Sequence, residues 1–375
     1  MASIGISGGM NFRQKLGQLD WGLIILLGIV GSIGITALYS AAGGHFQPWA
    51  ARQILHFILG TTIMLFIALT DIKWWQRLAY PLYAAGLVLL VVVWAVGTKG
   101  MGAQRWINIG FFQLQPSELM KIAVIMALAR YFHAASERDA RGIVFLIPAA
   151  LIIVVPVGLV MLQPDLGTAM MIILGGAGMF FIGGAPLWLF LGGMAVAAAA
   201  APVAWHFMHD YQRQRVLIFM HPEADPLGAG YHIMQSKIAL GSGGVNGRGF
   251  LNGTQSHLNF LPEKQTDFIF TLWCEEWGLF GGVALLALFA LIMAYCGWIA
   301  MRCRHDFGRL LAFGLMMNFS LYCFVNIAMV MGIIPVVGVP LPLVSYGGTA
   351  VLSILAGFGL IMSCNIHRDA KLPRM

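Results

Sequence analysis

The sequence predicts an all-α polytopic membrane protein with about ten transmembrane helices. Hydrophobic residues make up 59% of the 375 residues and charged residues only 10%, whereas a soluble domain carries about 25% charged residues. The apolar residues are gathered into long runs, and the basic residues favour one side of these runs. We therefore treat residues 1–375 as a single transmembrane domain with both termini in the cytoplasm.

Ten apolar segments are long enough to cross a bilayer, which takes about 20 helical residues. They are, in chain order, Trp21–Ala42, Ile54–Thr70, Leu78–Gly97, Leu119–Phe132, Ile143–Leu162, Thr168–Gly184, Leu187–Phe207, Phe268–Met301, Leu310–Ile334 and Thr349–Ile366. The fourth is short unless its helix begins near Pro116, since proline suits the first helical position. The eighth is so long that it must tilt or project beyond the bilayer.

The basic residues set the orientation of these helices. The larger set lies on one side and comprises Arg13, Lys15, Lys73, Arg77, Arg130, Arg138, Arg141, Arg302, Arg304, Arg309, Arg368, Lys371 and Arg374. The short loops of the other side carry Arg52, Lys99, Arg105 and Lys121. The positive-inside rule places the larger set in the cytoplasm. The large polar loop, residues 208–267 between helices seven and eight, then faces the periplasm or cell exterior. The same bias accounts for the net charge of +7 without nucleic-acid binding.

Asp267 stands where the large polar loop meets the eighth segment, three residues after Lys264. A carboxylate at the start of a helix is stabilised by the helix dipole, and it can serve simply as a cap. At the membrane boundary it can also reach a lipid head group, while the nearby ammonium can meet a phosphate. The residues alone leave both interpretations open.

Four other acids fall in or beside apolar segments. Glu118 and Lys121 have the spacing of an ion pair on one helix face, and Asp165 after Pro164 either joins them or forms a local turn. Glu275 and Glu276 are adjacent, so their side chains point about 100° apart and do not form one pair. They either bind a cation or act as structural partners inside the bundle.

Two further features of the large polar loop have competing interpretations. Arg213 and Arg215 could bind a phosphate of the substrate or lie against lipid head groups. The glycine-rich turn, Gly241–Gly249, matches no nucleotide-binding pattern and is better explained as a hydrogen-bonding turn. The histidines show no metal-ligand spacing. These features suit an amphiphilic substrate with an anionic head, yet they do not choose between a transporter, an enzyme and a scaffold.

Several motifs together resemble those of the SEDS family, named for shape, elongation, division and sporulation. They are, in chain order, QRWINIG, QPSELMKIA, QPDLGT, HDYQRQRV, DPLGAGYHIMQSKIALGSGG, GTQSHLNFLPEKQTDFIF and GVPLPLVSYGG. The resemblance covers nearly the whole chain, with the motifs in the family's order. The short N-terminus and the DYQRQRV segment favour the branch that acts in rod-shape elongation over the division branch.

The resemblance implies a peptidoglycan glycosyltransferase of the bacterial inner membrane that polymerises lipid II on the periplasmic side. Its implied partners are a class B penicillin-binding protein, which cross-links the strands, and other proteins of the elongation complex. Asp267 matches the family's essential catalytic aspartate. Glu118 and Lys121 match a functionally important pair, and Asp165 matches an acid near the central cavity. The family often has histidine where this chain has Gln265, which excludes a histidine base at that position.

The implied reaction suits a carboxylate at position 267. The acceptor sugar's 4-hydroxyl loses a proton as it attacks the anomeric carbon of the lipid-linked donor, and Asp267 can take that proton as general base in an inverting displacement. Because Asp is a weak base, we expect partial desolvation to raise its basicity. The leaving polyprenyl pyrophosphate needs positive charge. We assign substrate binding to Lys264, Arg213, Arg215, Arg105, Glu118, Lys121 and Asp165.

No permanent cofactor is expected, although a transient divalent cation, Mg²⁺ or Mn²⁺, could add positive charge at the leaving group. Two other functions fit the same residues. A lipid II flippase would use the acids and cavity without a reaction, and a scaffold would only hold the penicillin-binding protein. Polymer formed in detergent would exclude the flippase alone, and loss of function at Asp267 would exclude the scaffold.

Overall fold

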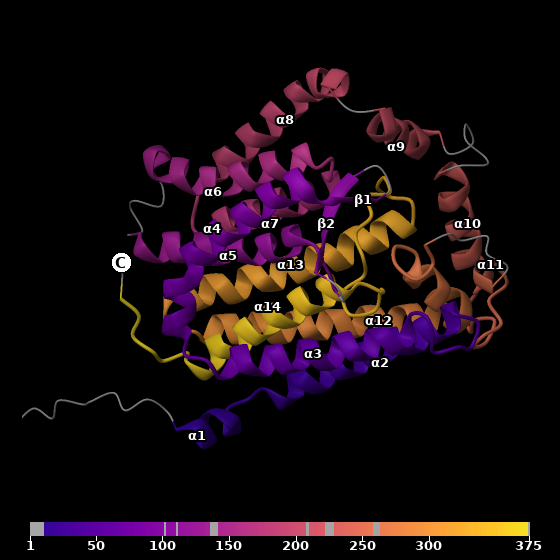
Figure 1. The fold of residues 1–375 in the computed structure, drawn as a ribbon, viewed down its shortest axis with the longest axis horizontal. Coiled ribbons are helices and arrows are strands. Elements are labelled where there is room, and N and C mark those ends of the chain that lie inside the picture. Colours follow the sequence, from indigo (N-terminus) through magenta and orange to yellow (C-terminus); the bar gives the residue numbers. More distant parts are fainter. Residues whose placement is uncertain are drawn as a thin grey trace, which may run out of the picture.

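The computed structural model describes residues 11–100, 103–109, 112–135, 142–207, 210–221, 229–257 and 263–373. Most of these residues are helical (Figure 1). The helices are α1 (Phe12–Gly17), α2 (Trp21–Ala41), α3 (Ala50–Leu69), α4 (Ile72–Val96), α5 (Pro116–Ala134), α6 (Ile143–Leu162), α7 (Leu166–Ile182), α8 (Leu187–Phe207), α9 (Asp210–Met220), α10 (Ala229–Ser242), α11 (Thr254–His257), α12 (Ile269–Arg302), α13 (Asp306–Val330) and α14 (Gly348–Ile366). The strands β1 (Thr98–Gly100), β2 (Ala103–Ile109) and β3 (Phe112–Leu114) form one antiparallel sheet.

Each of the ten predicted apolar segments is a helix in the structure, with ends that differ by a few residues. Among the described residues, seven helices are long and apolar enough to cross a membrane, namely α2, α3, α4, α6, α12, α13 and α14. The apolar helix α7 and the apolar part of α8 (Leu187–Ala200) are shorter. The structure therefore shows a mostly helical, multi-pass membrane protein, and the seven spans are the part of the predicted topology that length and hydropathy support.

Helix α5 is central in the bundle, where it packs against α4, α13 and α7. Most of its residues are buried, including Glu118 and Lys121. A helix with protein on all sides can carry charges that pair inside the bundle, which is why hydropathy marks this helix only weakly. Pro116 occupies its first turn, as the sequence indicated.

The all-α prediction is wrong in one detail, because the predicted outer loop before α5 contains the three-stranded sheet. Strands of three residues carry almost no alternating pattern, so they become stable only through pairing, here Ile107 opposite Leu114. The large polar loop also contains helices. Its helix α10 packs against α12, with Ile233, Ser236 and Ala239 buried.

The two ends of the bundle differ in character. Figure 1 shows α1 and the C-terminal segment at one end of the long helices, and α9, α10 and α11 at the other. At the first end Lys15 donates to the carbonyl of Leu69, and Arg130 donates to the carbonyls of Gln76 and Arg77, each at 3.0 Å. Basic residues from distant segments thus gather at one end of the bundle.

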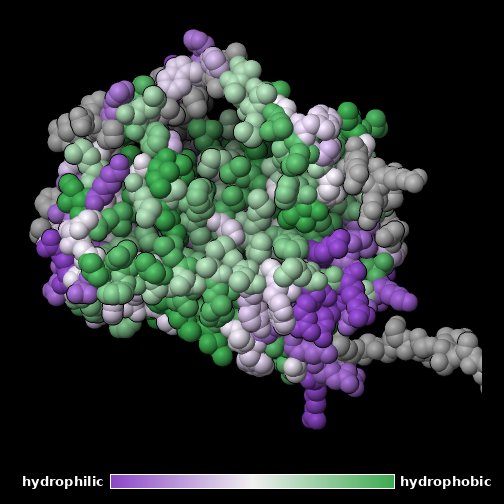
Figure 2. Space-filling view, turned by 180° about the vertical axis from the view of Figure 1, so that it is seen from behind, coloured by the Kyte–Doolittle hydropathy of each residue, from purple (hydrophilic) through white to green (hydrophobic). Residues whose placement is uncertain are grey.

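The surface of the bundle agrees with a membrane position. Figure 2 shows a broad hydrophobic face flanked by hydrophilic residues.

Candidate functional site

A buried polar cluster joins α5, α13 and α14. Lys121 Nζ lies 2.7 Å from Glu118 Oε1, one helical turn away. Tyr322 donates its hydroxyl to Oε2 of Glu118 at 2.5 Å, while Lys121 donates to the hydroxyl of Tyr322 and lies over its ring. Ser353 donates to the same Oε2 at 3.3 Å. The charged side chains of the pair are 3–4% exposed, so their charges are balanced by protein groups, as burial requires.

A second charged pair joins the sheet to the start of α7. Arg105 Nε lies 3.5 Å from Asp165 Oδ2, and the guanidinium also donates to the carbonyl of Pro164 at 3.0 Å. Asp165 caps α7 by accepting from the amide and the hydroxyl of Thr168 at 3.2 and 2.8 Å. Asp165 is also near enough to Tyr322 for an electrostatic interaction. The two pairs therefore belong to one charged region of the bundle.

Asp267 lies in the turn 263–268, which precedes α12. The cap position of α12 is Phe268, so Asp267 is one residue outside the helix. The carbonyl of Asp267 accepts from Asn326 Nδ2 of α13 at 3.0 Å. A Cβ built on Gly338 would lie 3.6 Å from Asp267 Oδ2, so the half-buried carboxylate faces that glycine. The catalytic candidate thus sits between α12 and a loop about 70 residues later in the chain.

That loop, residues 336–347, which we call the proline loop, is tied to the turn 263–268 through main-chain atoms. Ser345 Oγ donates to the carbonyl of Thr266 at 2.5 Å, and the amide of Tyr346 donates to the carbonyl of Gln265 at 2.8 Å. Gln53 of α3 in turn donates to the carbonyl of Ser345 at 3.1 Å. Residues from three distant segments therefore hold the backbone around Asp267.

The glycine-rich turn packs against a break in α12. At Gly278 the backbone leaves the helical region, with φ of 64° and ψ of −161°. The carbonyl of Glu275 accepts from the amide of Arg248 at 3.0 Å. The carbonyl of Glu276 accepts from the amide of Gly249, also at 3.0 Å. The turn therefore supplies donors to carbonyls that the break removes from the helical ladder, which agrees with the interpretation as a hydrogen-bonding turn.

The side chains of Glu275 and Glu276 point to different elements, as expected for adjacent positions on a helix. Glu275 accepts from the amide of Gln255 at 2.8 Å, and Glu276 accepts from the hydroxyl of Ser40 in α2. Both acids are buried. These contacts fit the structural interpretation, in which each acid joins α12 to another segment.

The predicted cations of the large polar loop lie in two separate places. Lys264 shares the turn 263–268 with Asp267, and burial lowers the pKa of its ammonium below the ordinary value. Arg213 lies in α9 and donates to the carbonyls of Trp205 and His206 in α8, at 2.8 and 2.7 Å. Arg215 is also in α9, but its side chain falls outside the described residues. Lys264 is thus the predicted cation that the fold brings into the same turn as Asp267.

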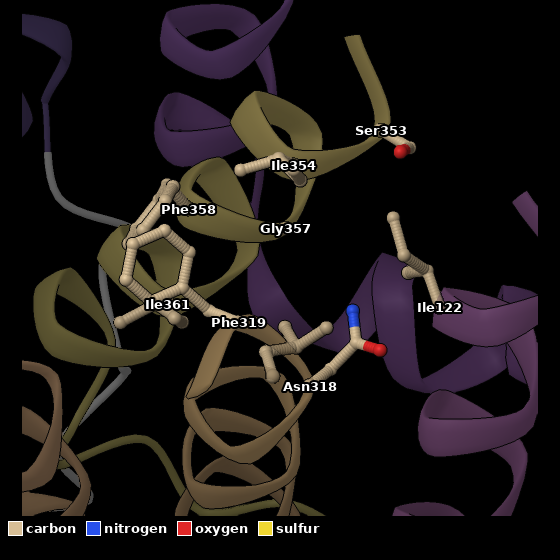
Figure 3. A pocket seen from close by; sticks show the side chains of 9 residues that line it. Ile122, Asn318, Phe319, Ser353, Ile354, Gly357, Phe358 and Ile361 are labelled. Carbon is tan, nitrogen blue, oxygen red and sulfur yellow. The ribbon is translucent and has the colours of Figure 1, made fainter. Parts of the chain in front are cut away.

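Sequence reasoning missed the polar partners on α13. Asn318, Tyr322 and Asn326 recur every fourth residue and so share one face of this span. Polar residues within a membrane span are costly, and such a stripe is a signal for function that the sequence does carry. Figure 3 shows Asn318 and Ser353 lining a small cavity with apolar residues such as Ile122 and Phe358. The stripe therefore extends the polar cluster into the bundle.

Among the described side chains, no group of three or more His, Cys, Asp or Glu residues is arranged to hold a metal ion. Four of the acids described above accept from serine, threonine or tyrosine hydroxyls, main-chain amides or cationic side chains, namely Glu118, Asp165, Glu275 and Glu276.

Together the spans and the charges paired inside them define a multi-pass membrane protein with a polar site at one end of its bundle. Residues 16–371 match the family model described as cell cycle protein, FtsW/RodA/SpoVE. The chain therefore belongs to the FtsW/RodA/SpoVE family, the SEDS family that the motifs resembled.

The chain is 46% identical over 353 residues to the peptidoglycan glycosyltransferase MrdB of Escherichia coli K12, which covers 92% of this chain and 93% of that protein. A crystal structure of the rod shape determining protein RodA of Thermus thermophilus matches with a TM-score of 0.72 and 30% identity, over 94% of this chain and 98% of that one. A chain from a peptidoglycan synthase complex, described as coordinating polymerization and crosslinking, matches with a TM-score of 0.81 and 33% identity, over 94% and 99%. These likenesses confirm the predicted family and its RodA-like branch.

Proposed function

We propose that this protein is a peptidoglycan glycosyltransferase that polymerises lipid II during cell elongation. The observation that supports this proposal most is the position of Asp267. This half-buried residue lies at the junction of α12, α13 and the proline loop, and its backbone is held there by hydrogen bonds. The names and high identity of the relatives support the activity. The main-chain contacts support a carboxylate that keeps one direction, which a general base needs.

The reaction follows from this placement. The acceptor's 4-hydroxyl oxygen attacks the anomeric carbon of the donor, and the bond from that carbon to the pyrophosphate oxygen breaks. Asp267 takes the hydroxyl proton, and the polyprenyl pyrophosphate leaves with the electron pair of the broken bond. Lys264 would stabilise the negative charge of the pyrophosphate from the same turn. Arg105, Arg213, Arg215, Glu118, Lys121 and Asp165 stay predictions as substrate-binding residues. Their described contacts, such as those between Arg105 and Asp165, suggest that several of them shape the site.

The membrane arrangement that goes with this function has ten spans, with α5, α7 and α8 added to the seven apolar ones. Both termini lie in the cytoplasm of a bacterial inner membrane, and the large polar loop lies between spans seven and eight in the periplasm. The gathering of Lys15 and Arg130 at the end with α1 supports this orientation. A class B penicillin-binding protein is the proposed partner, and the likeness to a synthase complex supports it. In this proposal a divalent cation would be bound only to the pyrophosphate of the substrate, as its counterion.

The test is polymerisation of purified lipid II by the full chain in detergent, with and without a class B penicillin-binding protein and Mg²⁺ or Mn²⁺. Asp267→Asn should lower the rate about 100-fold or more, because general-base catalysis contributes about 10²–10⁴-fold. Its unfolding temperature should match that of the unchanged protein. The matched control is Asp306→Asn, which removes an exposed acid paired with Arg309 at the opposite end of α13 from the turn 263–268.

The two alternatives give different results in this assay. A flippase forms no polymer in detergent, where there are no leaflets between which lipid II could move. A scaffold is indifferent to Asp267→Asn. An Asp267→Asn variant with full polymerisation rate would remove this residue from the mechanism.

A further inference from the structure

Two main-chain carbonyls near the site lie outside regular secondary structure. The carbonyl of Asp267 precedes the cap residue of α12, so it is outside the helical ladder. The carbonyl of Val339 lies in the proline loop, where Pro340 and Pro342 have no amide hydrogen to offer. A buried carbonyl without a donor is destabilising by about 1–3 kcal/mol. Both groups therefore need a donor from elsewhere in the fold.

Asn326 supplies both donors from one side chain. Its Nδ2 donates to the carbonyl of Asp267 at 3.0 Å and to the carbonyl of Val339 at 2.8 Å. The side chain has no exposed surface. The two acceptors determine how the amide is turned, because an oxygen in place of Nδ2 would face two carbonyl oxygens. Asn326 thus joins the start of α12 to the proline loop.

We propose that Asn326 is a positioning residue for the glycosyl transfer, acting on the Asp267 carboxylate through the main-chain carbonyl of the same residue. The proposal rests on Asp267 being the general base. Asn326 does not reach the substrate in this proposal. It holds the main chain of Asp267 in a constant place, and this fixes the point from which the carboxylate extends.

The neighbouring carbonyl is held in a complementary way. Ser345 Oγ donates to the carbonyl of Thr266 and accepts from the amide of Leu341 at 2.8 Å. Consecutive carbonyls of the turn 263–268 are therefore held by α13 and by the proline loop. A displacement of about 1 Å in a reacting group can cost about 100-fold in rate, so a clamp on both carbonyls bears directly on catalysis.

The same helix links this clamp to the buried charged cluster. Tyr322 is one turn before Asn326 on α13, and it donates to Glu118. The ion pair of Glu118 and Lys121 thus fixes the helix from which Asn326 reaches Asp267. This link gives the buried pair a mechanical connection to the reacting carboxylate without direct contact.

The experiment compares Asn326→Ala with Asn318→Ala in the full chain. Both changes remove a buried amide from the same face of α13, but Asn318 lies about two helical turns before Asn326 and lines the cavity of Figure 3. The readouts are kcat and KM for lipid II polymerisation, the unfolding temperature, and hydrogen exchange of the amides in residues 264–272. Asn326→Gln, which keeps both donors, and Ser345→Ala extend the series if Asn326→Ala fails to fold.

We expect Asn326→Ala to lower kcat about 10-fold to 100-fold with KM changed less than about threefold. Hydrogen exchange at residues 264–272 should rise in Asn326→Ala and Ser345→Ala, and stay unchanged in Asn318→Ala. Asn326→Gln should recover part of the rate. Equal losses of rate in the two alanine variants, in proportion to their unfolding temperatures, would overturn the proposal. So would unchanged exchange at residues 264–272 in Asn326→Ala. If the unchanged protein makes no polymer, the proposed function fails, and the exchange data still decide whether Asn326 holds the turn.

Discussion

The buried cluster around Glu118 and the turn that carries Asp267 hold their carboxylates in opposite ways. The Glu118 carboxylate accepts from Lys121, Tyr322 and Ser353, so its side chain is engaged by the protein itself. Around Asp267, Asn326 and Ser345 donate to main-chain carbonyls. One region is stabilised through its side chains, whereas the other is positioned through its backbone.

The difference separates two roles for an acid near a membrane. A buried carboxylate surrounded by donors has its charge balanced by protein groups, which suits a structural part. Around Asp267, the contacts of Asn326 and Ser345 hold the backbone from which the carboxylate extends, as its proposed role in proton transfer requires. The comparison therefore separates the proposed reacting group, Asp267, from the buried pair of Glu118 and Lys121, which joins α5 to α13 and α14.

The largest effect is expected from a substitution in the buried cluster around Glu118. Lys121→Met leaves the Glu118 carboxylate buried without its cation, which should destabilise the protein by about 3–5 kcal/mol. Unfolding in detergent, followed by circular dichroism, measures this loss. The double variant Lys121→Met with Glu118→Gln should recover much of the stability, because no unpaired charge then remains. A single variant as stable as the unchanged protein would contradict the assignment of this pair as a structural support.

A smaller effect should follow from disturbing the first part of α12, which directly follows the turn 263–268. Gly247 has a φ of 80°, and a Cβ there would lie 2.1 Å from the carbonyl oxygen of Glu276. Gly247→Ala should therefore destabilise the protein by about 1–3 kcal/mol and slow polymerisation, since it displaces the first part of α12. Gly241→Ala is the control, because that glycine is helical and has nothing within 4 Å of its added Cβ. Equal stability of the two variants would show that the glycine-rich turn does not hold α12.

The smallest effect concerns pH and Lys264. Burial lowers the pKa of this ammonium below its ordinary value of 10.5, so the unfolded chain binds the proton more tightly. The charged form therefore reduces stability at neutral pH, and this penalty is lost as the pH rises from the folded pKa to 10.5. Unfolding temperatures measured over that window should rise in the unchanged protein by more than in Lys264→Met. Parallel curves would mean that Lys264 is not desolvated.

Much of the site could be foreseen from local patterns. The ion pair of Glu118 and Lys121 follows from a spacing of three on a helix, and the position of Asp267 follows from the boundary between polar and apolar residues. The partners could not be foreseen in the same way. Tyr322 meets Glu118 across 204 residues of chain, and no periodicity links such positions. The four-residue spacing of Asn318, Tyr322 and Asn326 predicts which face of α13 is polar, but it does not predict which groups that face contacts.

The helices and the polar loop could be predicted from the sequence because a membrane-spanning helix requires a continuous run of about 20 apolar residues. The contacts of the turn 263–268 could not be predicted from such a local pattern. Its sequence marks Asp267 as a candidate, yet Asn326 and Ser345 contact the turn from two other segments, and Gln53 of a third segment contacts Ser345. Hydrogen bonds act only at about 3 Å, and the packing of α3, α12, α13 and the proline loop decides which distant groups come that close.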